Sequence, residues 1–191
     1  MESIDPIVIE RTRNWIREIV IGLNFCPFAR KPFKEELILY KVDSTSANAV
    51  ALESFINTCH FLEDNAATET ALLIFPNGFS DFEAYLDLVD LSEKLLKAEG
   101  FEGVYQVASF HPDYLFAGSD ENDPANYTNR SPYPMLHLLR EDLLEIAIAT
   151  VNKKISITLG AGSDFDNGAD AKFSIARRYS RGASYAAGIT G

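Results

Sequence analysis

Two of the three histidines in this sequence, His111 and His137, stand at the ends of a segment in which no regular element is predicted before Pro132. A connection of this length is usually functional or disordered, and its aromatic residues argue against disorder. Asp113 follows His111 by two residues, so in an extended chain both side chains would project to the same side. A carboxylate beside an imidazole orients the ring and raises its pKa, which suits a general base. The alternative is a structural histidine that is hydrogen-bonded to a loop carbonyl.

A second candidate lies where Pro132 or Pro134 is predicted to begin a fourth helix. This helix is predicted from apolar residues at helical spacing, namely Leu136, Leu139, Leu143 and Ala147. His137 would then lie in the first turn and share a face with Arg140, three residues later. The free N–H groups of such a turn could bind an anionic group.

Two further residues near this helix could contact a substrate. The guanidinium group of Arg130 could bind a carboxylate or a phosphate through two parallel hydrogen bonds, and Tyr133 is a candidate for substrate binding beside it. The alternative is that Arg130 and Arg140 only fix the loop, Arg140 for example by pairing with Asp113.

Cys26 is the third candidate for chemistry. A thiol between Phe25 and Pro27 is often a small buried hydrophobic group. If His111 or His137 approaches it, Cys26 could act as a nucleophile with a histidine base. The three residues could instead hold zinc or iron in a Cys-His-His site with an open coordination position. The sequence leaves all three interpretations of Cys26 open.

The elements that must position these residues alternate between helices and strands. An N-terminal helix is predicted from Asp5, and further helices after the caps at 43–46 and from the capping box of Ser80 and Glu83. Strands are predicted over residues 36–42, 70–75 and 104–110. This order predicts an α/β fold with a small three- to four-stranded sheet, crossover helices and an N-terminal helix. A ferredoxin-like α+β arrangement is the alternative.

The C-terminal stretch differs from the rest of the chain. Six of the eleven glycines lie in residues 160–191, and residues 151–191 hold six basic and three acidic side chains in an otherwise acidic protein. We therefore expect one α/β domain over residues 1–154 and an atypical Gly-rich tail over residues 155–191, in which residues 155–159 could add an edge strand.

The composition restricts the class of protein. A net charge of −11 disfavours binding to nucleic acid and to anionic membranes. No apolar run approaches the roughly 18 residues of a membrane span, and the N-terminus lacks the pattern of a signal peptide. The two cysteines do not form a disulfide framework. We expect a cytosolic protein that binds a small molecule; the oligomeric state is left open.

Three stretches resemble the signature strings of a known family. They are residues 24–29 (NFCPFA), 110–112 (FHP) and 129–140 (NRSPYPMLHLLR). The chain is similar over residues 5–153 to a bacterial and plastid family known as domain of unknown function 1415. The resemblance brings no established activity, substrate or cofactor. It does imply that Cys26, His111, Arg130, His137 and Arg140 belong to one pattern and share a pocket.

Together these observations suggest an enzyme that acts on a small anionic metabolite. Arg130 would hold the anion, His111 would act as the base oriented by Asp113, and Cys26 would be the nucleophile or metal ligand, with His137 completing the site. The alternatives are a non-catalytic module that binds a ligand or a protein through the 111–137 loop, and a purely structural motif that locks this loop onto the sheet.

Overall fold

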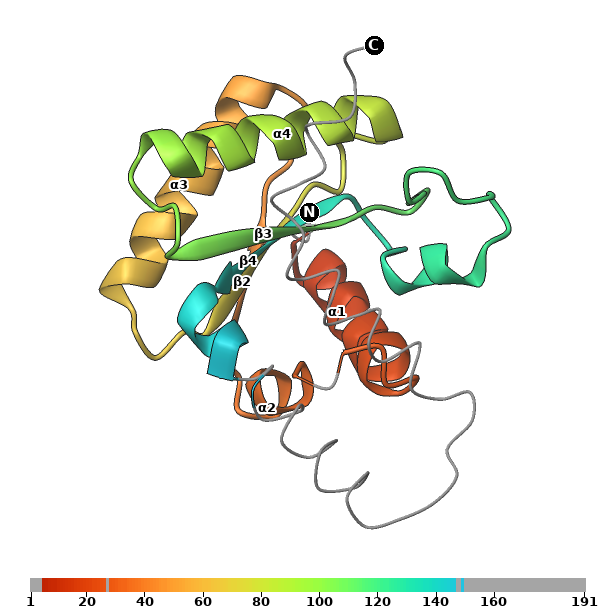
Figure 1. Cartoon of the computed structure of the whole chain (residues 1–191), viewed down its shortest axis with the longest axis horizontal. Coiled ribbons are helices and arrows are strands. Elements are labelled where there is room, and N and C mark those ends of the chain that lie inside the picture. The colour runs from red at the N-terminus through yellow and green to blue at the C-terminus, as the bar shows by residue number, and fades with distance from the viewer. Residues whose placement is uncertain (1–4, 27, 147–148, 150–191) are drawn as a thin grey trace.

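The computed structural model describes residues 5–26, 28–146 and 149. The helices lie in two layers, with α3 and α4 on one side of the sheet and α1 on the other (Figure 1). The elements follow in the order α1 (Asp5–Trp15), η1 (Ile16–Ile21), α2 (Arg30–Lys34), β1 (Ile38–Val42), α3 (Asn48–Asp64), β2 (Thr70–Ile74), α4 (Phe82–Ala98), β3 (Tyr105–Phe110), η2 (Pro124–Thr128) and β4 (Met135–Arg140).

The sheet has four strands in the order β1-β2-β4-β3. β1 and β2 are parallel neighbours joined through α3, whereas β4 pairs antiparallel with both β2 and β3. This arrangement confirms the predicted α/β fold. It is not the ferredoxin-like alternative, because that fold follows the order β-α-β-β-α-β, whereas here two helices separate the first three strands and β3 leads to β4 without a crossover helix.

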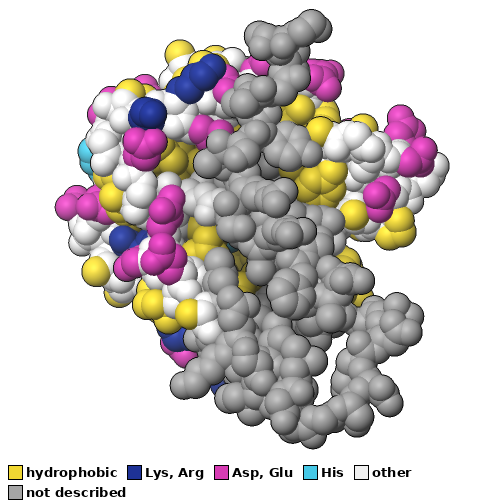
Figure 2. All heavy atoms as spheres, viewed as in Figure 1, with side chains coloured by type: hydrophobic (Ala, Val, Ile, Leu, Met, Phe, Trp, Pro, Cys, Tyr) yellow, Lys and Arg dark blue, Asp and Glu magenta, His cyan; other side chains and the backbone are white. Residues whose placement is uncertain are grey.

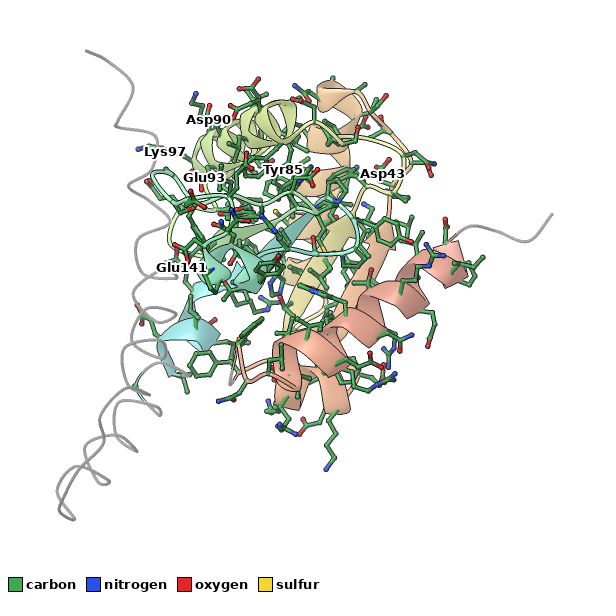
Figure 3. All side chains as sticks on the ribbon, turned by 90° about the vertical axis from the view of Figure 1, so that its right-hand side faces the viewer. Asp43, Tyr85, Asp90, Glu93, Lys97 and Glu141 are labelled. Atoms are coloured by element: carbon green, nitrogen blue, oxygen red, sulfur yellow. The ribbon has the colours of Figure 1, made fainter. Side chains whose placement is uncertain are left out.

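The face of the sheet under α3 and α4 carries the larger core. Tyr85 shows how closely it is fitted, because its hydroxyl donates to Met135 O at 2.8 Å and accepts from the Phe110 N–H at 2.9 Å. Figure 3 shows Tyr85 pointing from α4 toward the sheet. The buried residues of this core include Phe55, Cys59, Leu62, Leu73, Tyr85, Leu88, Leu136 and Leu138. We call this side the α4 face.

The opposite side, which we call the α1 face, holds a smaller core. Its buried residues are Val8, Ile16, Leu72, Ile74, Phe110 and Met135. Side chains alternate between the two faces along a strand. In β2 all five residues are buried, as expected for a central strand covered on both sides. The predicted central strand over residues 70–75 is therefore confirmed.

The fourth helix predicted from Pro132 or Pro134 is wrong, because residues 135–140 form the strand β4 between β2 and β3. Leucines at helical spacing suggested the helix, but Met-Leu-His-Leu-Leu is also a short apolar run. Such a run suits a strand buried on both faces equally well. Its backbone groups bond to two distant strands, a possibility that local spacing does not reveal. Helical structure begins only after β4, at residues 141–146.

No helix in the described part of the chain is long and apolar enough to cross a membrane. Over α3 and α4, acidic side chains are interspersed with basic ones (Figure 2). The predicted tail over residues 155–191, with its edge strand at 155–159, lies outside the described residues.

Candidate functional site

His111 is fully buried just beyond β3, with a hydrogen bond on each ring nitrogen. Its Nε2 donates to the Phe79 carbonyl at 2.9 Å, and its Nδ1 accepts from the backbone N–H of Asp113 at 3.0 Å. The ring lies 5.1 Å from that of Phe82 and 5.0 Å from that of Tyr85, both on α4. The histidine therefore fastens the start of the 111–131 loop to the turn before α4.

The expected role of Asp113 needs correction. Its backbone N–H, rather than its carboxylate, orients the His111 ring. Burial lowers the pKa of His111, and neither the hydrogen bond to Phe79 nor the charge of Asp113 overcomes this effect. The pKa is thus not raised in the way that the carboxylate–imidazole hypothesis required.

Two asparagines that the sequence did not single out organise the rest of this loop. The buried Asn126 accepts from the Phe116 N–H and the Ser119 hydroxyl through Oδ1, and it donates to Asp120 O through Nδ2. Asn129 donates to Ser109 O at 3.0 Å. The Asn and Ser content of the loop was the signal, since these side chains often bond to nearby backbone.

The two arginines expected to hold an anion donate to protein carbonyls instead. Arg130 donates to Tyr114 O at 3.3 Å and to Glu121 O at 3.2 Å, and its guanidinium lies 4.6 Å from the ring centre of Tyr127. Arg130 therefore links separate parts of the same loop.

Arg140 lies at the other end of the segment, on the α4 face. It donates to Thr68 O at 3.2 Å, to Leu62 O at the end of α3, and to the Tyr105 hydroxyl at 3.3 Å. It shares no helix face with His137, because residues three apart on a strand point to opposite sides. Its bonds fix the carboxyl end of α3 to the sheet.

His137 projects from the middle of β4 onto the α1 face, opposite to His111. Its register partners are Leu72 on β2 and Ala108 on β3. Its Nε2 lies 2.7 Å from Thr70 Oγ1, whereas its buried Nδ1 has no hydrogen-bond partner. Burial lowers the pKa of His137 to about 4. Tyr133 packs against the same face, and its hydroxyl accepts from Arg11 at 3.3 Å.

Cys26 lies in the turn after η1 and is half-buried, with its N–H bonded to Val20 O at 3.3 Å. Within the described residues, no three or more His, Cys, Asp and Glu side chains are placed to hold a metal ion. The predicted zinc or iron site of Cys26, His111 and His137 is therefore not formed, because the two histidines project from opposite faces of the sheet.

An open hollow of about 450 Å³ lies near the carboxyl ends of β1 and β2. In Figure 3, Asp43, directly after β1, marks the end of the sheet where β1 and β2 stop, and Glu141, directly after β4, marks the opposite end. The lining of the hollow combines hydroxyls, an amide, two carboxylates and a small apolar surface: Ser46, Asn48, Phe79, Ser80, Asp81, Ala84 and Asp87. These residues come from the starts of α3 and α4 and from the turns that precede them. The sequence analysis did not predict this site.

The walls of the hollow are held by close backbone contacts. A Cβ atom on Gly78 would lie 2.1 Å from Thr45 O, so only glycine lets the two turns approach this closely. Phe79 has a φ of +58°, a conformation that costs free energy for a bulky residue. The Phe79 carbonyl accepts from His111, and its ring packs 5.0 Å from that of Phe75. His111 therefore helps to position one wall.

The helix starts at the hollow differ in their caps. Asp81, rather than the predicted Ser80, caps α4, because its carboxylate accepts from the Ala84 N–H at 2.9 Å. Ala47, at the cap position before α3, provides no side-chain cap. The free N–H groups of the first turn of α3 can therefore bond to water or to a ligand.

Comparison with known proteins identifies the family. Residues 7–160 match the family model described as a protein of unknown function (DUF1415). This range covers most of the 191 residues, so the chain belongs to that family. No curated protein and no solved structure matches the chain.

Proposed function

We propose that this member of the DUF1415 family binds a small polar molecule in the hollow at the carboxyl ends of β1 and β2. One observation carries the proposal. The hollow lies where open α/β sheets bind ligands, beyond the carboxyl ends of parallel strands and beside the first turns of the helices that follow them. Its volume of about 450 Å³ lies within the range of small-molecule sites.

The lining favours a ligand that donates hydrogen bonds. Asp81 and Asp87 bring negative charge, and Ser46, Asn48 and Ser80 can both donate and accept. Among the residues that the structure describes, no Lys or Arg lines the hollow. A small amine or a polyol fits this chemistry better than the anionic metabolite considered from the sequence, because carboxylates repel an anion.

The proposal changes the roles of the residues considered from the sequence. His111 becomes a positioning residue, since it holds the Phe79 carbonyl and does not itself line the hollow. Arg130 and Arg140 support the loop and the sheet. The proposal is limited to binding, and it assigns no base or nucleophile to the hollow.

The test is a titration followed by the backbone amide signals in NMR, with ethanolamine, glycerol and inorganic phosphate as probes. Ethanolamine should shift the amides of residues 46–50 and 79–87. Asp87→Asn should weaken ethanolamine binding by about tenfold, the value of one charge-assisted hydrogen bond. The matched control is Glu83→Gln, because Glu83 lies in the first turn of α4 and does not line the hollow.

Two results would overturn the proposal. One is the absence of any response by the amides around the hollow to ethanolamine and glycerol. The other is a response to phosphate alone, which would restore the anionic ligand considered from the sequence.

A further inference from the structure

His137 presents an unused hydrogen-bond acceptor on the α1 face. The Thr70 hydroxyl donates its one proton to Leu138 O, so His137 Nε2 must carry a proton and donate to Thr70 Oγ1. A neutral imidazole has one N–H and one lone pair. Nδ1 is therefore the lone-pair nitrogen, and it is buried without a partner.

Such an atom requires an explanation. Buried polar side-chain atoms in folded proteins almost always have a hydrogen-bond partner, and the exceptions often mark a catalytic role or a bound water or ion. A pKa of about 4 keeps the ring neutral at physiological pH. It also makes His137 a poor general base there, because an efficient base has a pKa near the working pH. The arrangement suits a hydrogen-bond acceptor.

A second unpartnered group lies in the same row of the sheet. Tyr40 on β1 pairs with Leu72 on β2, which pairs with His137 on β4, so all three side chains project onto the α1 face. The Tyr40 hydroxyl is buried and forms no hydrogen bond of normal geometry. These two atoms are the buried side-chain nitrogen and oxygen atoms without a partner in the described part of the chain.

The surroundings define what could occupy this row. Leu72 is 3% exposed and separates the two polar groups, and the Phe110 ring lies 6.0 Å from the imidazole. The Arg13 guanidinium lies 5.4 Å from the Tyr40 ring centre. Arg13 also forms an ion pair with Glu36 at 2.6 Å. Both Tyr40 and His137 keep part of their surface exposed, so the row lies next to solvent, while its two unpartnered polar atoms are themselves buried.

We propose that this row is a second binding site, separate from the hollow, for a small neutral molecule with an apolar body and one hydroxyl or N–H donor. The donor bonds to His137 Nδ1, the apolar body lies against Leu72 and Phe110, and the Tyr40 hydroxyl bonds to a second polar atom of the ligand. An anion does not fit, because the lone pair of Nδ1 cannot donate a hydrogen bond to it.

The test compares phenol with toluene, which has the same apolar ring but no hydroxyl. The readout is the NMR signal of His137 Nδ1 in protein labelled with ¹⁵N-histidine, because this signal moves when the lone pair accepts a hydrogen bond. Phenol should shift the signal and bind about tenfold more tightly than toluene, as expected for one buried hydrogen bond.

His137→Gln is the informative variant, because its amide can still donate to Thr70 while the Nδ1 lone pair is lost. It should weaken phenol binding about tenfold and leave toluene binding unchanged. His60→Gln, at an exposed histidine outside the row, is the matched control and should change neither affinity. Asp87→Asn should also leave phenol binding unchanged, which separates this inference from the function proposed for the hollow.

The inference is overturned if phenol and toluene bind equally, if phenol binds without moving the Nδ1 signal, or if phenol does not bind. It is also overturned if the Nδ1 signal of the free protein already has the position of a hydrogen-bonded nitrogen and phenol leaves it there, because a resident water would then occupy the site.

Discussion

The two faces of the sheet differ in how completely the buried polar atoms of a histidine and a tyrosine are hydrogen-bonded. On the α4 face, His111 bonds through both ring nitrogens and Tyr85 through both functions of its hydroxyl. On the α1 face, one ring nitrogen of His137 has no hydrogen-bond partner, and the Tyr40 hydroxyl, near the Arg13 guanidinium, forms no hydrogen bond of normal geometry. A buried polar network with all its hydrogen bonds made rigidifies the fold, whereas a buried polar group without a partner requires an explanation, which we propose to be a ligand.

The largest expected effect is that of His111→Ala. The change removes two buried hydrogen bonds and the packing against α4, and it frees the strained turn at Phe79. We expect the free energy of unfolding to fall by about 4 kcal/mol, measured by urea denaturation. His60→Ala, at an exposed histidine, should change it by about 0.5 kcal/mol or less. A similarly small effect of His111→Ala would contradict the conclusion that the hydrogen-bonded histidine on the α4 face stabilises the fold.

The second prediction concerns the pH dependence of stability. His137 takes up a proton near pH 6.5 in the unfolded chain but only near pH 4 in the folded protein. The unfolded state therefore binds more protons between these values, and stability falls as the pH falls from 6.5 to 4, by about 3 kcal/mol in total.

His137→Gln should remove most of this fall, while the smaller contribution of His111, whose pKa burial also lowers, stays. Urea titrations at several pH values provide the measurement. An unchanged acid profile in the variant would show that the ring is not buried as a neutral group.

The third prediction compares two tyrosines. Tyr85→Phe leaves the Met135 carbonyl and the Phe110 N–H without their partner, so we expect a loss of about 2 kcal/mol. Tyr40→Phe removes a hydroxyl that lies near the Arg13 guanidinium but forms no hydrogen bond of normal geometry, and we expect stability to be unchanged or slightly raised. Thermal unfolding of both variants measures the difference. Equal losses would mean that the Tyr40 hydroxyl has a partner in solution.

The smallest predicted difference is that between the reaction rates of the two cysteine thiols. Cys59 is fully buried on the α4 face, and burial raises the pKa of its thiol to about 12, so it should react only when the protein unfolds. Cys26 is half-buried and should react faster in the native state, as mass spectrometry after a short exposure to iodoacetamide would reveal. Faster reaction at Cys59 would contradict the closed packing of this face.

Much of the architecture could be predicted from local patterns. The run from Thr70 identified a central strand because few other elements bury five consecutive residues, and the caps and glycines placed α3 and α4 to within a few residues. The candidate site was harder to predict. His111, Arg130 and Arg140 are residue types that suit catalysis or anion binding, and nothing local shows that each of them donates to distant backbone carbonyls.

The sequence by itself determined the alternation of helices and strands, the α/β class and the family, because these depend on periodicity, turn residues and motif strings within short stretches. The tertiary structure decided that residues 135–140 form a strand, since the hydrogen bonds that favour it come from β2 and β3, far away in the chain. That pairing places His137 on the α1 face. Because a side chain on a strand points to only one face of the sheet, His137 is separated from His111 on the α4 face. The bonding partners of each polar atom are set by contacts distant in sequence, and these contacts determine which histidine is left with a free lone pair.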